Sequence, residues 1–257
     1  MSETTRYKLT IEYNGAPYSG WQRQADVISV QEEVEKAIAA IIQQPVTIHV
    51  AGRTDAGVHA KGQVIHVDLP PFKRPMEPFE IAKAINAHLR PQPISVIGTE
   101  IVSDDFHARF AARNKLYLYR IIRRGAFLTH DQGLAWQFKK PLDVKAMREG
   151  AKHLIGHHDF TSFRDSQCQA KSPMRTLARL EISTRPYDVC GGIEIRIEVE
   201  GRSFLHHQVR NMVGTLALVG EGKWQADDVR KALEAKDRTA AGPTCPADGL
   251  YLMRVDY

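Results

Sequence analysis

The sequence predicts an α+β fold built from two similar halves, and three observations lead to this prediction. Segments rich in β-branched residues alternate with segments whose apolar residues recur at helical spacing. The order strand, helix, two strands, helix occurs in each half of the chain. No Pro- or Ser-rich linker separates the halves. We therefore expect two ferredoxin-like α+β halves, residues 1–110 and 111–257, that share a continuous antiparallel sheet with helices packed on it.

The first half is expected to open with a strand over residues 7–13, which Asn14-Gly15 ends. Ser29 and Glu32 form a capping box, which predicts a helix with its apolar face running to Ile42. The remaining elements expected in this half are strands over residues 46–50 and 63–69, a helix over residues 78–89 and a strand over residues 94–102.

The second half is expected to open with a strand over residues 115–122. Asp143 is placed to cap the next helix, and Gly156 can stop it. Isoleucine and valine alternate with charged residues over 193–200, which indicates a half-exposed antiparallel strand. The other expected elements are a strand over residues 177–184 that pairs across the Gly191-Gly192 turn, helices over residues 208–219 and 227–235, and a closing strand over residues 250–255.

Composition is that of an ordinary folded protein with a modest basic excess. The chain has 257 residues, of which 43% are hydrophobic and 25% charged, so a disordered or collagen-like chain is excluded. Its 35 basic and 30 acidic residues give a net charge of +5, which suits a polyanionic partner. No apolar run approaches the ~20 residues that span a bilayer, and residues 1–6 are polar, so we expect a cytoplasmic protein. The three cysteines lack C-x-x-C spacing, so neither a disulfide framework nor a thiolate zinc site is expected.

Reactive side chains first gather in residues 52–59 (GRTDAGVH), between two expected strands. One interpretation is a plain turn, in which Asp55 accepts nearby backbone N–H groups and Gly57 supplies a positive φ. The other is that the two strands hold one carboxylate rigidly while Arg53 keeps it ionised, so that Asp55 can act as a nucleophile. Composition alone does not decide between them.

A basic stretch follows at residues 106–130, which contain six Lys or Arg residues and no acidic one. Basic side chains interleaved with Phe and Tyr are typical of phosphate contact combined with base stacking. A solvated basic strand is the alternative. Within this strand Arg120 falls on the same side as the leucines, so that face cannot be uniformly buried, and Tyr119 is expected in the core.

The pair His206-His207 suggests a metal site, but adjacent residues on a regular element point in different directions and no carboxylate stands at ligand spacing. No metal is therefore expected. Arg210, on the helix that follows, should meet a carboxylate if it lies near the core. No glycine-rich phosphate loop follows a strand, so no nucleotide cofactor is expected.

Taken together, these motifs resemble the tRNA pseudouridine synthase A family, and the resemblance covers essentially the whole chain. The GRTDAGVHA block at 52–60, preceded by Ala51, is the most specific part. The other matching segments are Tyr13-Asn14-Gly15, Gly20 to Gln24, Ser29 to Gln31, Gly62 to Val64, Asp105 to Phe110, Lys115-x-Tyr117-x-Tyr119, Asp159 to Phe163, Phe204 to Gly214 and Gly249 to Leu252.

The resemblance implies conversion of uridine to pseudouridine in the anticodon arm of tRNA, in a central catalytic cleft, by a homodimer without metal or organic cofactor. It implies that Asp55 is the nucleophile, that the Tyr117 ring lies on the target base and that Arg210 is the ionic partner of the carboxylate. The residues expected to bind substrate are Tyr117, Arg53, His59, Arg23, Arg109, Arg113 and Arg124.

The sequence leaves the site of nucleophilic attack and two alternative functions open. The carboxylate could add to the pyrimidine ring or act at the ribose carbon. A noncatalytic RNA-binding or RNA-folding module would also explain the basic charge and the aromatic residues. An RNA hydrolase that uses His206 or His207 as acid and base is the third reading.

Overall fold

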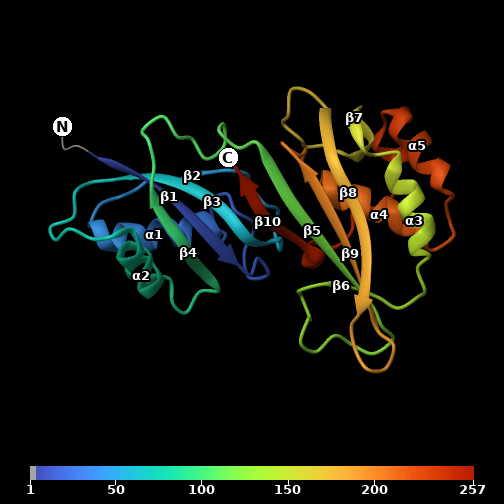
Figure 1. Cartoon of the computed structure of the whole chain (residues 1–257), viewed down its shortest axis with the longest axis horizontal. Helices are drawn as coiled ribbons and strands as arrows, with labels where there is room; N and C mark the ends of the chain where they lie inside the picture. The colour runs from blue at the N-terminus through green and yellow to red at the C-terminus, as the bar shows by residue number, and fades with distance from the viewer. Residues whose placement is uncertain (1–3) are drawn as a thin grey trace. The chain divides into compact units, whose positions relative to one another are not determined.

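The computed structural model describes residues 4–257 and confirms the α+β class (Figure 1). The described chain forms two compact units. Unit 1 contains the residues up to Arg113 together with Leu252–Tyr257, and unit 2 contains Asn114–Tyr251. Strand β10 (Leu250–Asp256) carries the chain from unit 2 back into unit 1.

The strands of unit 1 follow the order β4-β1-β3-β10, and the short β2 pairs with β3. Strand β1 is antiparallel to both β3 and β4, which agrees with the antiparallel sheet expected from the sequence; the pairing partners were not predicted. Strand β2 is shorter than the expected 46–50, because the N–H of Ile48 points to the Glu35 carboxylate of the first helix instead of a strand. The bounds are β1 Thr5–Tyr13, β2 His49–Val50, β3 His59–Leu69 and β4 Ile94–Ile101.

Two helices of unit 1 pack against each other on one side of its strands (Figure 1). Helix α1 (Val30–Ile42) begins where the capping box predicts, since the Ser29 side chain accepts the N–H of Glu32. Helix α2 (Pro78–Leu89) has the predicted bounds and starts on a proline, whose missing N–H is not needed in a first turn.

Four antiparallel strands of unit 2 follow the order β5-β9-β8-β7. A three-residue strand, β6, pairs with β5 in the parallel direction. The sequence did not predict β6 or β7, which are too short for a periodic signal. The bounds are β5 Asn114–Arg123, β6 Trp136–Phe138, β7 Gly156–Asp159, β8 Met174–Pro186 and β9 Ile193–Gly201.

The helices of unit 2 are α3 (Val144–Lys152), α4 (Gln208–Gly220) and α5 (Ala226–Ala235), and they pack together beside its strands (Figure 1). Asp143 caps α3 as predicted. The helix ends before Gly156, because the next residues form a tighter turn that keeps Leu154 buried, and Gly156 instead starts β7. No helix within residues 4–257 has the length and apolar content needed to cross a bilayer.

Strand β9 alternates as predicted, with one exception. Glu194 was expected on the exposed side, yet only 1% of its side chain is exposed. Arg120 and Arg185 each donate to its carboxylate, at 2.8 and 2.6 Å, and Arg120 also bonds Asp131. Burial alone would raise the pKa of Glu194, but these two arginines hold it below its usual value. The arginine on the leucine side of β5 is therefore accommodated by a buried carboxylate.

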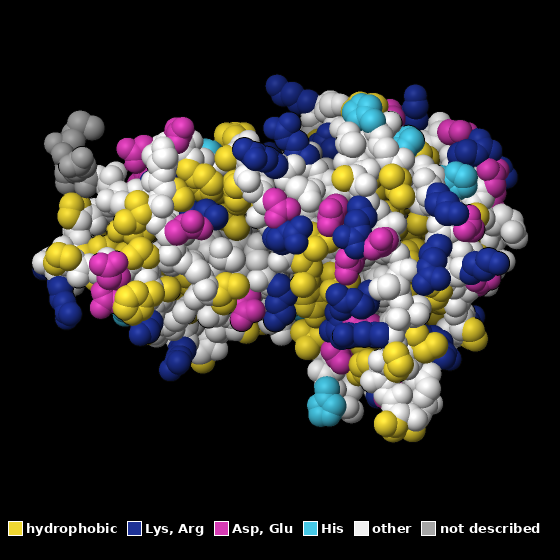
Figure 2. Space-filling model, viewed as in Figure 1, with side chains coloured by type: hydrophobic (Ala, Val, Ile, Leu, Met, Phe, Trp, Pro, Cys, Tyr) yellow, Lys and Arg dark blue, Asp and Glu magenta, His cyan; other side chains and the backbone are white. Residues whose placement is uncertain are grey.

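The exposed side of β8 and β9 carries opposite charges in contact. Arg179 lies within ion-pair distance of Glu198 and Glu200, at 2.9 and 3.2 Å, and Arg196 lies 3.7 Å from Glu198. Figure 2 shows basic and acidic side chains side by side over these strands. Because these charges compensate one another, this surface adds little to the attraction of a polyanion.

Candidate active site

Asp55 lies in a turn of unit 1 between β2 and β3 and is half-buried. The turn is closed by the N–H of Val58, which donates to the carbonyl of Asp55 at 3.1 Å, and Gly57 has a φ of 76°. Arg53 lies two positions earlier with its side chain exposed. The turn expected from the sequence is therefore present, with Asp55 half-buried within it.

Buried polar contacts hold this turn against β1 and β3. The hydroxyl groups of Tyr13 and Thr54 lie 2.8 Å apart, and Gln63 donates to the carbonyl of Gly52 at 2.7 Å. Burial raises the pKa of Tyr13 to about 12, so its hydroxyl stays neutral. The residue before Asp55 is thus fixed to the strands. Tyr13, Thr54 and Gln63 stand in segments that match the family, but their supporting role was not predicted.

Two glycines let the segment before α1 lie directly on the turn. A side chain at Gly15 would put its Cβ 2.0 Å from the carbonyl oxygen of Val58, and one at Gly20 would reach 2.8 Å from that of Thr54. Gly20 also has a φ of 93°, which favours glycine. The N–H of Trp21 donates to the carbonyl of Thr54 at 3.0 Å. The turn is consequently packed on its inner side by backbone, which allows little movement.

His59, an expected substrate contact, is 1% exposed at the start of β3. Its Nδ1 accepts the N–H of Gly15 at 3.0 Å. The structure therefore places this imidazole inside unit 1, where it fixes the segment that covers the Asp55 turn.

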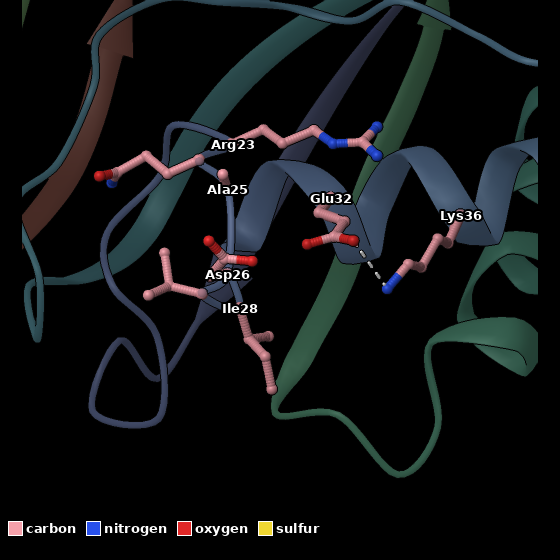
Figure 3. A pocket seen from close by; sticks show the side chains of 8 residues that line it. Arg23, Ala25, Asp26, Ile28, Glu32 and Lys36 are labelled. Atoms are coloured by element: carbon pink, nitrogen blue, oxygen red, sulfur yellow. Dashed lines mark ion pairs between the residues drawn. The ribbon is translucent and has the colours of Figure 1, made fainter.

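Arg23, another expected substrate contact, lines a surface pocket of about 570 Å³ in unit 1 (Figure 3). Its side chain extends along α1, and its guanidinium lies 3.7 Å from the carboxylate of Glu35. Glu32 and Lys36 form an ion pair of 3.0 Å in the same pocket. The pocket thus has mixed charge, in contrast to a purely basic phosphate site.

Tyr117 lies on β5 of unit 2 and is 8% exposed. The ring of Phe204, in the segment between β9 and α4, meets it edge to face with centroids 5.1 Å apart. Tyr119 is fully buried and donates its hydroxyl hydrogen to the carbonyl of Pro246 at 2.7 Å, which confirms that it belongs to the core. Both tyrosines are buried, and Tyr117 is the less buried of the two.

Arg210 lies in the first turn of α4 and is half-buried. Its Nε donates to the carbonyl of Cys245 at 2.9 Å, and the N–H of Cys245 in turn donates to the carbonyl of Arg210. These bonds fix the side chain near its branch point. Asp55 belongs to unit 1, whereas Tyr117 and Arg210 belong to unit 2.

The two histidines before α4 differ from the sequence expectation that they point apart. Their rings are in contact, with centroids 4.0 Å apart and planes tilted by 32°, and both Nδ1 atoms face Asp165, at 3.8 Å for His206 and 2.7 Å for His207. The reason is that His207 has a φ of 60°, so the pair lies in an irregular turn rather than on a regular element. The N–H of Gln167, with help from His207, lowers the pKa of Asp165.

The expected phosphate contacts differ in how available they are. Arg109 and Arg113 are exposed. Arg124 donates to the carbonyls of Ala126 and Phe127 and lies 3.5 Å from Asp188. Arg124 would have to give up these bonds to reach a phosphate, so Arg109 and Arg113 are the better placed of the three.

Sequence comparison with a family model and with curated proteins points to one family. The family model described as tRNA pseudouridine synthase matches residues 9–111 and 151–257. The chain is 56% identical over 252 residues to tRNA pseudouridine synthase A of Paramagnetospirillum magneticum, covering 98% of this chain and 95% of the relative. It is 54% identical to that of Dinoroseobacter shibae and 53% to that of Methylocella silvestris, covering 98% of this chain in both cases and 96% and 98% of the relatives. The matched ranges contain most of the chain, including the Asp55 turn, Arg210 and the start of β10. The chain therefore belongs to the tRNA pseudouridine synthase family.

Proposed function

We propose that this protein isomerises uridine to pseudouridine in the anticodon stem-loop of tRNA, with Asp55 as the nucleophile. The observation that carries the proposal is the Asp55 turn. Contacts from β1 and β3 and the close approach of Gly15 and Gly20 hold this turn in place, and the chain belongs to the pseudouridine synthase family. Rigid presentation matters because a reacting group gains most when its geometry is fixed before the substrate arrives.

The reaction balances without an added reagent. The bond from the ribose carbon C1′ to N1 breaks, the uracil turns, and a bond from C1′ to C5 forms. The hydrogen on C5 leaves as a proton to solvent, and N1 takes up a proton. Nothing is oxidised and no phosphoryl energy is consumed, so we expect neither a metal nor an organic cofactor.

Asp55 must be an anion to attack, either at the pyrimidine ring or at the ribose carbon, and both routes lead to the same product. A cationic partner in a water-poor site favours the ionised form. We assign that role to Arg210, whose Nε is anchored to the carbonyl of Cys245. Arg53, exposed on the same turn as Asp55, is left to contact the RNA backbone.

The target base must leave its stack before a carboxylate can reach it, and this costs a few kcal/mol. Stacking of a base on an aromatic side chain contributes ~1–3 kcal/mol of binding free energy, which offsets part of this cost. We assign this contact to Tyr117, because Phe204 supports its ring from the side and Tyr119 is committed to the core. The homodimer and the cytoplasmic location expected from the sequence are part of the same proposal.

The test is tritium release from tRNA labelled at uracil C5, because pseudouridine formation expels that hydrogen. We expect release in proportion to pseudouridine formed, and mapping should place the product in the anticodon stem-loop. A noncatalytic RNA-binding module would bind tRNA without release, and an RNA hydrolase would shorten the RNA. Either outcome, or product formed only outside the anticodon arm, would contradict the proposal.

A further inference from the structure

Three histidines of unit 1 gather at a place that the proposed chemistry does not use. His49 lies on β2, His66 on β3 and His107 in the segment after β4. The ring of His66 has its centroid 4.7 Å from each of the other two, and one ring nitrogen from each residue lies within 4.8 Å of the others. His66 is buried, His107 is half-buried and His49 is exposed, so the cluster opens to the surface.

Such a cluster could hold a metal ion, but its hydrogen bonds argue against ligation. The N–H of Ala108 donates to Nδ1 of His66 at 3.1 Å, and the N–H of Arg109 donates to Nδ1 of His107 at 3.1 Å. A nitrogen that accepts such a bond carries a lone pair, so the hydrogen of the neutral ring sits on Nε2. A metal at Nε2 would require the opposite tautomer and the loss of these backbone bonds.

These two rings therefore offer N–H donors rather than metal ligands. Within residues 4–257 nothing accepts a hydrogen bond from Nε2 of His66 or of His107. Burial, together with the other histidines, lowers the pKa of His66 to about 4 and also lowers that of His107, so both rings are neutral at pH 7. An oxyanion is the ligand that neutral N–H donors of this kind suit.

The surroundings of the cluster match an RNA strand more closely than a small anion. Phe110 is 71% exposed, and its ring lies 4.3 Å from that of His107, centroid to centroid. Arg109 is exposed and lies over the face of Phe110. An exposed aromatic ring beside a cation and hydrogen-bond donors can stack a base while the donors hold a phosphate.

The acidic residue on the same strand as His66 is compensated by an arginine. Asp68, on the same strand as His66, receives two hydrogen bonds from Arg6, at 2.7 and 2.8 Å. Those bonds lower the pKa of Asp68, so the pair is a neutralised unit. Asp105 accepts a hydrogen bond from the neutral hydroxyl of Ser103 and keeps its negative charge, which Arg109 and the N–H donors must outweigh.

We propose that His66 and His107 bind one backbone phosphate of tRNA through neutral imidazole N–H groups, while Phe110 stacks on an adjoining base and Arg109 adds the charge. The proposal rests on the proposed function only in taking tRNA as the ligand. It adds an RNA contact site in unit 1 separate in sequence from the Asp55 turn.

The salt dependence of tRNA affinity distinguishes the neutral N–H donor of His107 from the charge of Arg109. His107→Phe keeps an aromatic ring but removes the N–H, so tRNA affinity should fall about tenfold at every salt concentration. The slope of log affinity against log salt should not change, because no charge is lost. Arg109→Gln should reduce that slope by about one. The matched control His88→Phe, at an exposed position of α2, should change neither quantity. An affinity for His107→Phe equal to that of the control would overturn the proposal.

Nuclear magnetic resonance of the imidazole N–H groups gives the second test. An anticodon-arm RNA should shift the Nε2–H signals of His66 and His107, whereas zinc chloride should not. Loss of these signals at micromolar zinc would identify a metal site instead, and shifts with inorganic phosphate but not with RNA would identify a small-anion site; both contradict the proposal. Tritium release by the unaltered protein is measured in parallel. RNA-induced shifts without tritium release would support this RNA contact site and contradict the proposed function.

Discussion

The hydroxyl groups of Tyr13 and Thr54 lie 2.8 Å apart in the interior of unit 1, one residue before the proposed nucleophile. Tyr13 belongs to β1, and Gln63 of β3 points its amide at the same hydroxyl, at 3.4 Å. Buried hydroxyls that lose a partner are costly, by ~1–3 kcal/mol. The position of Asp55 thus depends on a polar contact that is buried behind the turn.

Tyr13→Phe should lower kcat about 10- to 100-fold, because it leaves Thr54 without its partner and loosens the turn. The affinity for tRNA should stay within about twofold. The control is Tyr7→Phe, on the same strand, where the hydroxyl bonds to no residue within 4–257. Steady-state kinetics with labelled tRNA measures both variants. Equal kcat values for the two variants would show that Tyr13 does not position the turn.

Gly15→Ala should disturb the turn by direct contact, since the new Cβ would lie 2.0 Å from the carbonyl oxygen of Val58. We expect a loss of about 1–3 kcal/mol in the free energy of unfolding, measured by denaturant titration, as for other overpacked sites. Gly98→Ala is the control, because its nearest neighbour would be Thr10 Cβ at 3.6 Å. Equal stability of the two variants would contradict the close packing described here.

Tyr117→Phe should bind and convert tRNA far better than Tyr117→Ala, because the proposed role needs the aromatic ring. Removing the ring should weaken substrate interaction by the ~1–3 kcal/mol of one base stack. Kinetics of the two variants, together with their thermal unfolding, separates stacking from a folding defect. Similar losses in two equally stable variants would assign the role to the hydroxyl instead.

Stability should fall as the solution is acidified from about pH 6.5 toward pH 4, in part because of His66. Burial, His49 and His107 lower the pKa of His66 to about 4, below the 6.5 of an unfolded chain. In that window the unfolded chain binds more protons, so acid favours unfolding. His66→Asn, whose Oδ1 takes the position of Nδ1 and can still accept the N–H of Ala108, should show a flatter dependence of melting temperature on pH. An unchanged pH profile would contradict the depressed pKa.

Elements with local signals could be predicted from the sequence. Helix α1 begins at the Ser29 cap and α2 at Pro78, because each signal acts on the backbone within a few residues. Strand β9 likewise follows its alternation. In contrast, the burial of Glu194 depends on Arg120, 74 positions away, which only the pairing of β5 with β9 brings near.

The candidate site also contains parts that the sequence could predict and parts that it could not. The Asp55 turn could be identified because its residues are contiguous. The contact between Tyr13 and Thr54 joins residues 41 positions apart, and the contact between the rings of His206 and His207 requires a positive φ that side-chain patterns do not reveal. The cluster of His49, His66 and His107 joins three separate segments, so no motif marks it.

The most direct test of the account is pseudouridine formation by Asp55→Asn, with tRNA binding measured on the same preparation. The substitution removes one charge and keeps the shape of the side chain. We predict no pseudouridine above background and a tRNA affinity within about threefold of the unaltered protein, because many other groups contact the RNA. Asp227→Asn, an equal change of charge on α5, should retain full activity. Sustained turnover by pure Asp55→Asn would contradict the assignment of Asp55 as the nucleophile.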